Sequence, residues 1–331
     1  GICLCSASFL MYLMYEYTSK KEVSHSFAGP CFALAVSLIS KPLFIPTVCI
    51  AFTYIKYPVP TEQYLPEYDI ESSIDGTWTF ALAVLITMLH PVLILIYQTF
   101  VFEIRHYMTN QIPTAKASPY CENVRIATKY LQVLGLFTIM PLSLTFYYLV
   151  AAGLNLVECA NYVYYLPYYR KSMNYAHAAV PLLGFWFSTS FLLGLSFDNA
   201  TMIMLFIVVI SPFFGILAYK LVDSRYQIIM KKPNFSSPWE CEVYLREAFK
   251  TEKNIFETYV EILKNHELED YKMLQVWLCY NLYGVLNDHI NARLKLTPVY
   301  ETHSTMYEEY QFLKCVKTLE AQEKSDVFNY L

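Results

Sequence analysis

The charged residues of this chain are unevenly distributed, and their frequency changes near residue 221. Residues 1 to 221 hold only 22 of the 52 Lys, Arg, Asp and Glu residues, whereas the last 110 residues hold the other 30. The first part consists largely of long apolar segments, and charged side chains are costly inside a bilayer. The pattern therefore predicts an all-α protein with a membrane domain at 1–222 and a water-soluble helical tail.

The overall composition agrees with this division. The chain is 56% hydrophobic and 16% charged, whereas about 25% of the residues in a soluble domain are charged. The net charge of −4 provides no basic surface for nucleic-acid phosphates, so we expect no nucleic-acid partner. The nine cysteines form no CxxC pair and are expected to be buried thiols. Because the chain begins with Gly1 inside an apolar run, we expect a longer parent protein.

The apolar segments predict about six membrane spans. A spanning helix needs about 20 mainly apolar residues, because the hydrocarbon layer is about 30 Å thick. The stretches that meet or approach this length are 2–17, 27–57, 78–102, 131–154, 178–197 and 202–222. We therefore expect an integral, multi-pass protein in contact with lipid.

Two polar residues within these segments are candidates for an intramembrane site. Lys41 lies beside Pro42 and near Pro46 in the second segment, which is too long for one straight helix and is expected to be proline-broken. His90 lies at the centre of the third segment, directly before Pro91. A polar group beside a proline can satisfy a freed carbonyl, so a structural role is favoured over a ligand or ion path.

The orientation depends on whether residues 27–57 cross the membrane once or form a hairpin, so the number of crossings stays open. A basic linker is predicted at 223–236, and its positive charges favour a cytosolic tail. The two glycosylation sequons, at Asn199 and Asn234, flank the sixth segment, so they face opposite sides. A cytosolic tail selects Asn199 as the possible glycosylation site.

An aromatic and basic segment at 161–171 is typical of a headgroup anchor. A ligand-stacking site is the alternative for the same residues. The candidate anchor residues are Tyr164, Tyr165, Tyr168, Tyr169, Arg170 and Lys171.

The tail at 237–331 is expected to form stacked helical hairpins of the TPR or HAT kind, and a plain helical bundle is the alternative. Ser237 and Glu240 form a capping box, with Pro238 at the first helical position. Apolar residues at helical spacing predict further helices at about 253–265, 269–286, 287–296 and 302–324. The candidate partner-docking residues are Trp239, Tyr244, Trp277 and Tyr280.

The motifs that carry chemistry are missing from the sequence. It contains no HExxH, no GxSxG and no P-loop, and its nine glycines are too dispersed to form a phosphate cradle. We therefore expect no enzymatic activity, no metal site and no cofactor.

Two motifs resemble one family of membrane proteins. The first is Lys41-Pro-Leu-Phe-Ile-Pro-Thr-Val-Cys49, followed by an acidic loop, and the second is Ser237-Pro-Trp-Glu-Cys-Glu-Val-Tyr-Leu-Arg246 with the helices that follow. Together they are similar to the membrane region and helical repeats of the tiny macrocysts protein B-like and C-like proteins of ciliates and other protists. The resemblance implies a multi-pass PAS domain-containing protein of the plasma or ciliary membrane. No PAS core is visible in this chain.

Two functions follow from these features. The first is a non-enzymatic membrane scaffold or sensor-type protein, whose cytosolic helical hairpins dock membrane or cytosolic subunits of a larger complex. The second is a channel or transporter subunit with a cavity near the broken second segment and His90. A water-filled path along Lys41 and His90 would support the second function, whereas close packing of these residues would oppose it.

Overall fold

The computed structural model describes part of the chain, and every regular element in that part is helical. The described residues are 44–56, 76–100, 116–195, 200–231, 235, 237–251, 272–284, 308, 310–317 and 319–320. An isolated antiparallel bridge joins Lys116 to Tyr168. The prediction of an all-α chain is confirmed for these residues.

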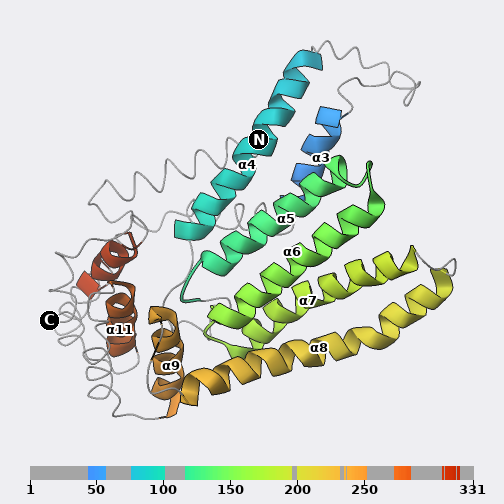
Figure 1. The fold of residues 1–331 in the computed structure, drawn as a ribbon. Helices are drawn as coiled ribbons and strands as arrows, with labels where there is room; N and C mark the ends of the chain where they lie inside the picture. Colours follow the sequence, from blue (N-terminus) through green and yellow to red (C-terminus); the bar gives the residue numbers. More distant parts are fainter. Residues whose placement is uncertain are drawn as a thin grey trace.

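The helices form a row of long elements with a shorter helical segment at one end (Figure 1). The long helices are α3 (Phe44–Lys56), α4 (Gly76–Phe100), α5 (Tyr120–Thr138), α6 (Leu144–Tyr165), α7 (Lys171–Gly194) and α8 (Ala200–Lys231), and the tail helices are α9 (Pro238–Thr251) and α11 (Lys272–Gly284). Helices α5 to α8 run alternately up and down, so the turn at 166–170 lies at the opposite end from the C-terminus of α7 and the N-terminus of α8. Helix α9 lies against the C-terminal end of α8.

The predicted span at 131–154 is wrong, because the chain reverses direction inside it. Helix α5 ends at Thr138 and α6 begins at Leu144, with Pro141 in the turn between them. Ser143 caps the new helix, since its side chain accepts a hydrogen bond from the Phe146 amide at 3.3 Å. Proline cannot donate a backbone hydrogen bond, so it fits this reversal better than the interior of a helix.

Within the residues that the structure describes, two helices are long and apolar enough to cross a membrane, namely α7 and the stretch of α8 from Met204 to Lys231. Helix α7 begins at Lys171, seven residues before the predicted span at 178–197, and α8 continues nine residues beyond the predicted span at 202–222. Helices α3 and α4 contain shorter apolar stretches. The predicted span at 2–17 and most of the second one lie outside the described residues.

Aromatic contacts join neighbouring long helices. Trp186 of α7 stacks on Phe214 of α8 with ring centroids 4.9 Å apart. Phe52 of α3 stacks on Phe137 of α5 at 5.3 Å. Large flat rings bury much apolar area, so these pairs stabilise the row of helices.

Large apolar side chains are also exposed on the outside of the long helices. Helix α8 is the extreme case, since only 11% of its most apolar stretch is buried inside the protein, against 28% for the corresponding stretch of α7. A core helix of a soluble protein would be mostly covered. The most exposed large apolar side chains are Met88, Leu142, Val180, Val208 and Phe213.

The first tail helix begins where the capping box predicts. Helix α9 starts at Pro238, and the Ser237 hydroxyl accepts a hydrogen bond from the Glu240 amide at 3.4 Å. Helix α11 coincides with the centre of the predicted helix at 269–286, and residues 310–317 are helical within the predicted helix at 302–324. The predicted helices at 253–265 and 287–296 lie outside the described residues.

Residues 223–231 of the basic linker predicted at 223–236 are not a separate connecting segment, because α8 continues without interruption to Lys231. Val222, Tyr226 and Ile229 of this extension are buried at helical spacing. The packing of these side chains explains why the segment remains helical despite its polar composition. The tail therefore begins on the end of a long helix.

Helices α6 and α7 are in close contact at Gly184. A Cβ atom at this position would lie 2.9 Å from Oδ1 of Asn155, which is closer than real Cβ contacts. Gly215 of α8 has no atom within 4 Å of the equivalent position. The two glycines therefore form a matched pair that differs in packing.

We expect Gly184→Ala to lower the free energy of unfolding by about 1–2 kcal/mol, because it overpacks the α6–α7 contact. Gly215→Ala should raise it by about 0.5–1 kcal/mol through helix propensity alone. Thermal unfolding of the two variants in the same detergent measures the difference. Equal effects of the two substitutions would contradict a close contact at Gly184.

Candidate functional site

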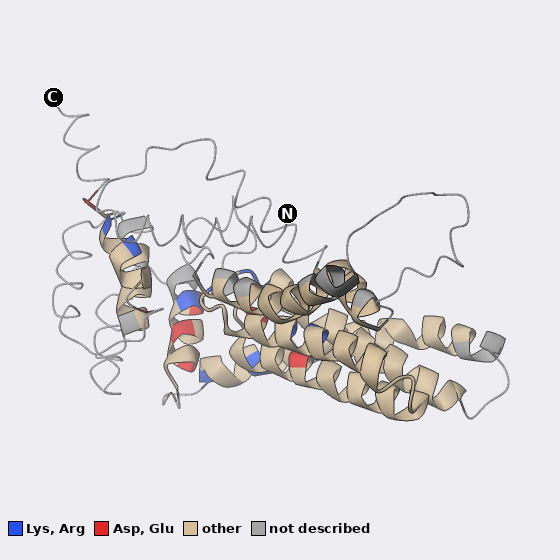
Figure 2. Cartoon of the chain, turned by 90° about the horizontal axis from the view of Figure 1, so that it is seen from above, with Lys and Arg blue, Asp and Glu red and all other residues tan. Residues whose placement is uncertain are grey.

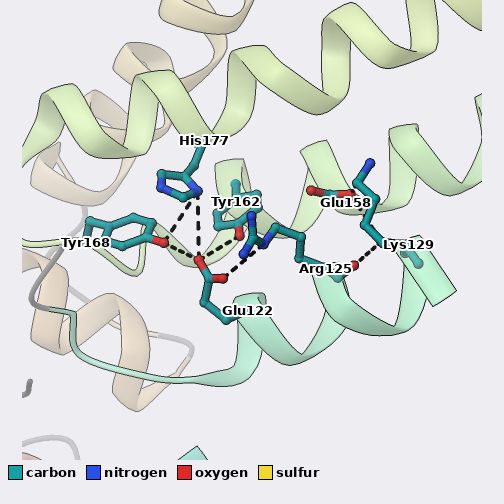
Figure 3. A network of polar contacts seen from close by, with 8 residues as sticks. Glu122, Arg125, Lys129, Glu158, Tyr162, Tyr168 and His177 are labelled. Atoms are coloured by element: carbon teal, nitrogen blue, oxygen red, sulfur yellow. Dashed lines mark hydrogen bonds and ion pairs between the residues drawn. The ribbon is translucent and has the colours of Figure 1, made fainter. Parts of the chain in front are cut away.

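The most concentrated group of polar side chains among the described residues surrounds Glu122 of α5 (Figure 3). The Glu122 side chain is almost completely buried, and its Oε1 atom accepts hydrogen bonds from the hydroxyls of Tyr162, at 3.0 Å, and Tyr168. Arg125 lies one turn further along α5, with Nε 3.0 Å from Glu122 Oε2. His177 of α7 completes the group, with Nδ1 3.8 Å from Oε1. We call these five residues the Glu122 network.

The charge of Glu122 is stabilised by its surroundings. Burial by itself would raise the pKa of this carboxyl group. The positive charges of Lys116 and Arg125, the Tyr168 hydrogen bond and His177 outweigh burial and hold the pKa well below its usual value. Glu122 is therefore an ionised, fully surrounded carboxylate.

A second cluster of polar side chains lies on α5 and α6. It is one to two helical turns further from the α6–α7 turn than the Glu122 network. The Lys129 ammonium is 3.2 Å from Glu158 Oε2, 3.2 Å from Asn155 Oδ1 and 3.3 Å from Gln132 Oε1. Thr128 donates a hydrogen bond to Glu158 at 3.1 Å. An ammonium group has three donors, so Lys129 is saturated by these acceptors.

The turn between α6 and α7 binds both the bundle and the tail, and Tyr168 is its central residue. Asn174 holds the Tyr168 backbone on both sides: its Nδ2 donates to the carbonyl at 2.7 Å, and its Oδ1 accepts from the amide at 3.0 Å. The same Nδ2 donates to the Tyr226 hydroxyl of α8 at 2.8 Å. The amide of Ala117 donates to the carbonyl of Pro167 at 2.8 Å. Segments before α5 and within α7 and α8 thus hold this turn in place.

Helix α9 of the tail holds the same turn through Arg246. The guanidinium donates to the carbonyls of Tyr168 and Leu166, both at 2.7 Å. Glu242, one turn earlier on α9, lies 3.4 Å from Arg246 Nη2. Burial by itself would lower the pKa of Arg246, but the nearby Glu242 charge and other groups raise it, so the side chain remains charged.

Two further ion pairs join the tail to the bundle. Arg225 of α8 lies 2.8 Å from Glu240 Oε1, and Lys171 of α7 lies 3.2 Å from Glu247 Oε2. The Arg225 pair is more buried than the Lys171 pair, whose lysine is half exposed. The tail is therefore attached to this end of the bundle by three separate basic side chains.

His90, one of the two predicted intramembrane residues, is not part of these clusters. His90 is completely buried in α4 and stacks on Phe44 with ring centroids 5.7 Å apart. Neither ring nitrogen has a hydrogen-bond partner, so the expected bond to a freed carbonyl is missing. This close packing does not support a water-filled path at His90. Lys41 lies outside the described residues.

The predicted headgroup anchor is divided between two environments. Tyr168 and Tyr169 are buried inside the protein, so an anchoring role for these two residues is wrong. Their hydroxyl and ring groups serve internal contacts, including Arg246 over the Tyr169 ring. The others are more accessible: Tyr164 and Lys171 are exposed, and Tyr165 and Arg170 are partly buried.

The predicted partner-docking residues lie mainly in the core of the tail. Trp277 and Tyr280 are buried, so neither can contact a partner in this conformation of the tail. Trp239 packs between Tyr165 and Trp277, and Tyr244 is partly buried. The predicted glycosylation site, Asn199, lies outside the described residues, directly before α8.

Sequence reasoning missed the Glu122 network because the predicted spans at 78–102 and 131–154 left residues 103–130 and Glu158 outside every span. The missed signal is polar spacing. Glu122, Arg125 and Lys129 of α5 follow one helical face, and Asn155, Glu158 and Tyr162 of α6 follow another, at the i, i+3, i+7 positions. Such matching stripes on two helices joined by a short turn indicate side chains that face each other.

The arrangement offers paired charges and no recognisable reaction centre. Within the described ranges, no group of three His, Cys, Asp or Glu side chains could hold a metal ion. The cysteines described there are free thiols. What the site does is fix the ends of α5, α6 and α7 to each other and to α9.

Comparison with known proteins adds no assignment. No protein-family model, curated protein or solved structure matches this chain.

We expect Glu122→Gln to destabilise the protein by about 3 kcal/mol, because it leaves the largely buried Arg125 without its anionic partner. Asp223→Asn is the control, since Asp223 makes only an exposed hydrogen bond with Gln227. The control should change stability by about 0.5 kcal/mol or less. Thermal unfolding at pH 7 measures both variants.

The effect of Glu122→Gln on stability, measured against the unsubstituted protein, has a defined pH dependence. The pKa of Glu122 is lower in the folded chain, so its contribution is complete above the pKa of a free glutamate, about 4.3, and is lost as pH falls further. The stability difference between the unsubstituted protein and Glu122→Gln should therefore be retained from pH 7 to about pH 5 and shrink below that. A difference that shrinks already between pH 7 and pH 6 would show that Glu122 is not held ionised.

Proposed function

We propose that this chain is a multi-pass membrane protein that acts as a non-enzymatic scaffold or sensor component, whose cytosolic tail docks protein partners. The observation that carries the proposal is α8. Its side chains from Met204 to Leu217 are largely apolar and exposed, whereas its last turns hold the tail. One helix thus connects a surface suited to lipid with a surface suited to water.

The distribution of charge supports a membrane position. Helices α4 to α8 carry no Lys, Arg, Asp or Glu at 76–100, 130–138, 144–157, 172–194 and 200–219. Figure 2 shows the charged residues gathered towards the end that carries α9, whereas the opposite end is uncharged in the described part. Hydrocarbon solvent favours this separation, because a bilayer accepts apolar side chains and excludes unpaired charge.

The buried charges fit the same interpretation. Lys129 and Glu158 lie within the row of helices, but they point toward each other and are saturated by neighbouring groups. Ionisable residues in membrane domains generally face the interior and pair with one another. Lipid-facing positions on α6 hold Phe146, Leu149 and Val157 instead.

The firm attachment of α9 supports a docking role for the tail. Arg225, Lys171 and Arg246 place the tail at the charged end in a defined orientation. A preorganised surface loses less freedom when a partner binds. The resemblance of the Lys41 to Cys49 and Ser237 to Arg246 motifs to the tiny macrocysts proteins adds the expectation of a plasma or ciliary membrane.

Orientation can be tested in cells with an epitope placed after Leu331. We expect the chain to resist alkaline extraction and the epitope to become accessible once the plasma membrane is selectively permeabilised. The connection between α7 and α8 lies at the opposite end (Figure 1), so a glycan should disappear in Asn199→Gln and persist in Asn234→Gln. Extraction of the chain by alkali would contradict the membrane proposal.

The scaffold role is tested by the native complex. Gentle solubilisation, size separation and mass spectrometry of the full chain should recover it with stoichiometric protein subunits. A matched sample carrying Arg225→Ala and Lys171→Ala, which weaken the attachment of the tail, should retain fewer of them. A monomer without subunits would contradict the scaffold role.

A further inference from the structure

One side chain of the tail, Arg246, binds a strained turn in the bundle. Leu166 ends α6 with φ of 46°, in the left-handed region, which an L-residue avoids because its Cβ approaches the next carbonyl oxygen. Such conformations persist only where the surroundings determine them. Arg246 contributes to this by binding the Leu166 carbonyl at 2.7 Å, and its guanidinium is buried there.

The same arginine reaches the Glu122 network through Tyr168. The Tyr168 carbonyl accepts a hydrogen bond from Arg246, and the hydroxyl of the same residue donates to Glu122. Tyr168 therefore has its backbone bound to the tail and its side chain bound inside the bundle. A shift of the turn moves both ends of this residue together.

Arg246 also acts as a cap from outside the helix. The last carbonyls of a helix lack partners within it, and a positive charge near them is favourable because of the helix dipole. Arg246 supplies both effects to the C-terminus of α6, from a position 80 residues further along the chain. If α9 moves away, the turn loses two charge-assisted hydrogen bonds and the restraint on Leu166.

We propose that α9 is a releasable clasp that couples the tail to the interior of the membrane bundle through Arg246 and Tyr168. With α9 docked, the turn is held and the Glu122 network is closed. With α9 released, Leu166 relaxes, Tyr168 leaves Glu122 and the network opens. The coupling is reciprocal, so opening of the network also loosens α9.

This regulation deepens the proposed scaffold role and rests on it only for the identity of the partner that would pull on the tail. The contacts themselves lie within one chain. Their test therefore uses the purified full chain without any partner. Failure of the test would overturn the coupling and leave the scaffold proposal standing.

Two buried cysteines report the two sides of the clasp. Cys121 precedes Glu122, is 1% exposed, and its Sγ donates to the Asn161 carbonyl at 3.6 Å. Cys241 lies on α9 and is completely buried. Cys279 in α11 is also buried and reports general unfolding of the tail.

The first experiment measures maleimide labelling of each cysteine by mass spectrometry in Arg246→Gln. We expect labelling of Cys121 to accelerate by about tenfold or more, because loss of even one of the two charge-assisted hydrogen bonds of Arg246 has an effect of this size. Cys279 should keep the labelling rate that it has in the unsubstituted protein. Lys171→Gln is the control, because it removes an ion pair between tail and bundle without touching the turn carbonyls. Because this half-exposed ion pair contributes little to the attachment of the tail, Lys171→Gln should accelerate the labelling of Cys121 far less than Arg246→Gln does.

The second experiment approaches the clasp from inside the bundle and does not alter the tail. Tyr168→Phe removes the hydroxyl that binds Glu122 and should accelerate the labelling of Cys241 on α9. Tyr165→Phe is the control, because it removes a tyrosine hydroxyl near Tyr168 and keeps the ring that packs on Tyr120 and Trp239. It should leave Cys241 protected.

Two outcomes would overturn the coupling. One is parental protection of Cys121 in Arg246→Gln and of Cys241 in Tyr168→Phe. The other is a parallel rise of Cys121, Cys241 and Cys279, which would show that these residues hold the whole fold together and do not connect two parts of it selectively.

Discussion

Burial of the Glu122 carboxylate is the constraint on which this end of the molecule depends. A carboxylate removed from water is costly unless opposite charge and hydrogen bonds replace its hydration. These groups are provided by Arg125 of α5, Tyr162 of α6 and Tyr168 of the turn that follows α6. To keep them within reach, α5, α6 and the following turn must hold one relative position, which is why the polar contacts here are so densely connected.

The described helices bury charged pairs within an apolar core and expose large apolar side chains. Lys129 and Glu158 face inward, whereas Leu149 and Val208 face outward. Water would favour the opposite arrangement. The Glu122 network and the lysine cluster also differ in their relation to the tail. The Glu122 network includes Tyr168, whose carbonyl binds Arg246 of the tail, whereas the cluster around Lys129 lies further along α5 and α6 and is bound by neither residue.

Part of this structure could be predicted because its signals are local. Ser237, Pro238 and Glu240 predicted the start of α9, and the bounds of α4 agree with the apolar segment at 78–102 within two residues. The reversal at Pro141 was missed, since a proline inside an apolar run is equally compatible with a kinked span. The partnership of Arg246 with Leu166 joins residues 80 positions apart, and no local pattern encodes it.

The uninterrupted course of α8 has a mechanical meaning for the tail. At 1.5 Å per residue its 32 residues extend roughly 48 Å. Helices resist bending except at residues such as Pro212, which lies inside α8, and α9 is attached beyond this proline through Arg225 and Glu240. In the proposed membrane position, the height and rotation of the tail would thus be set by the part of α8 that follows Pro212, and any subunit seated on the tail would inherit that orientation.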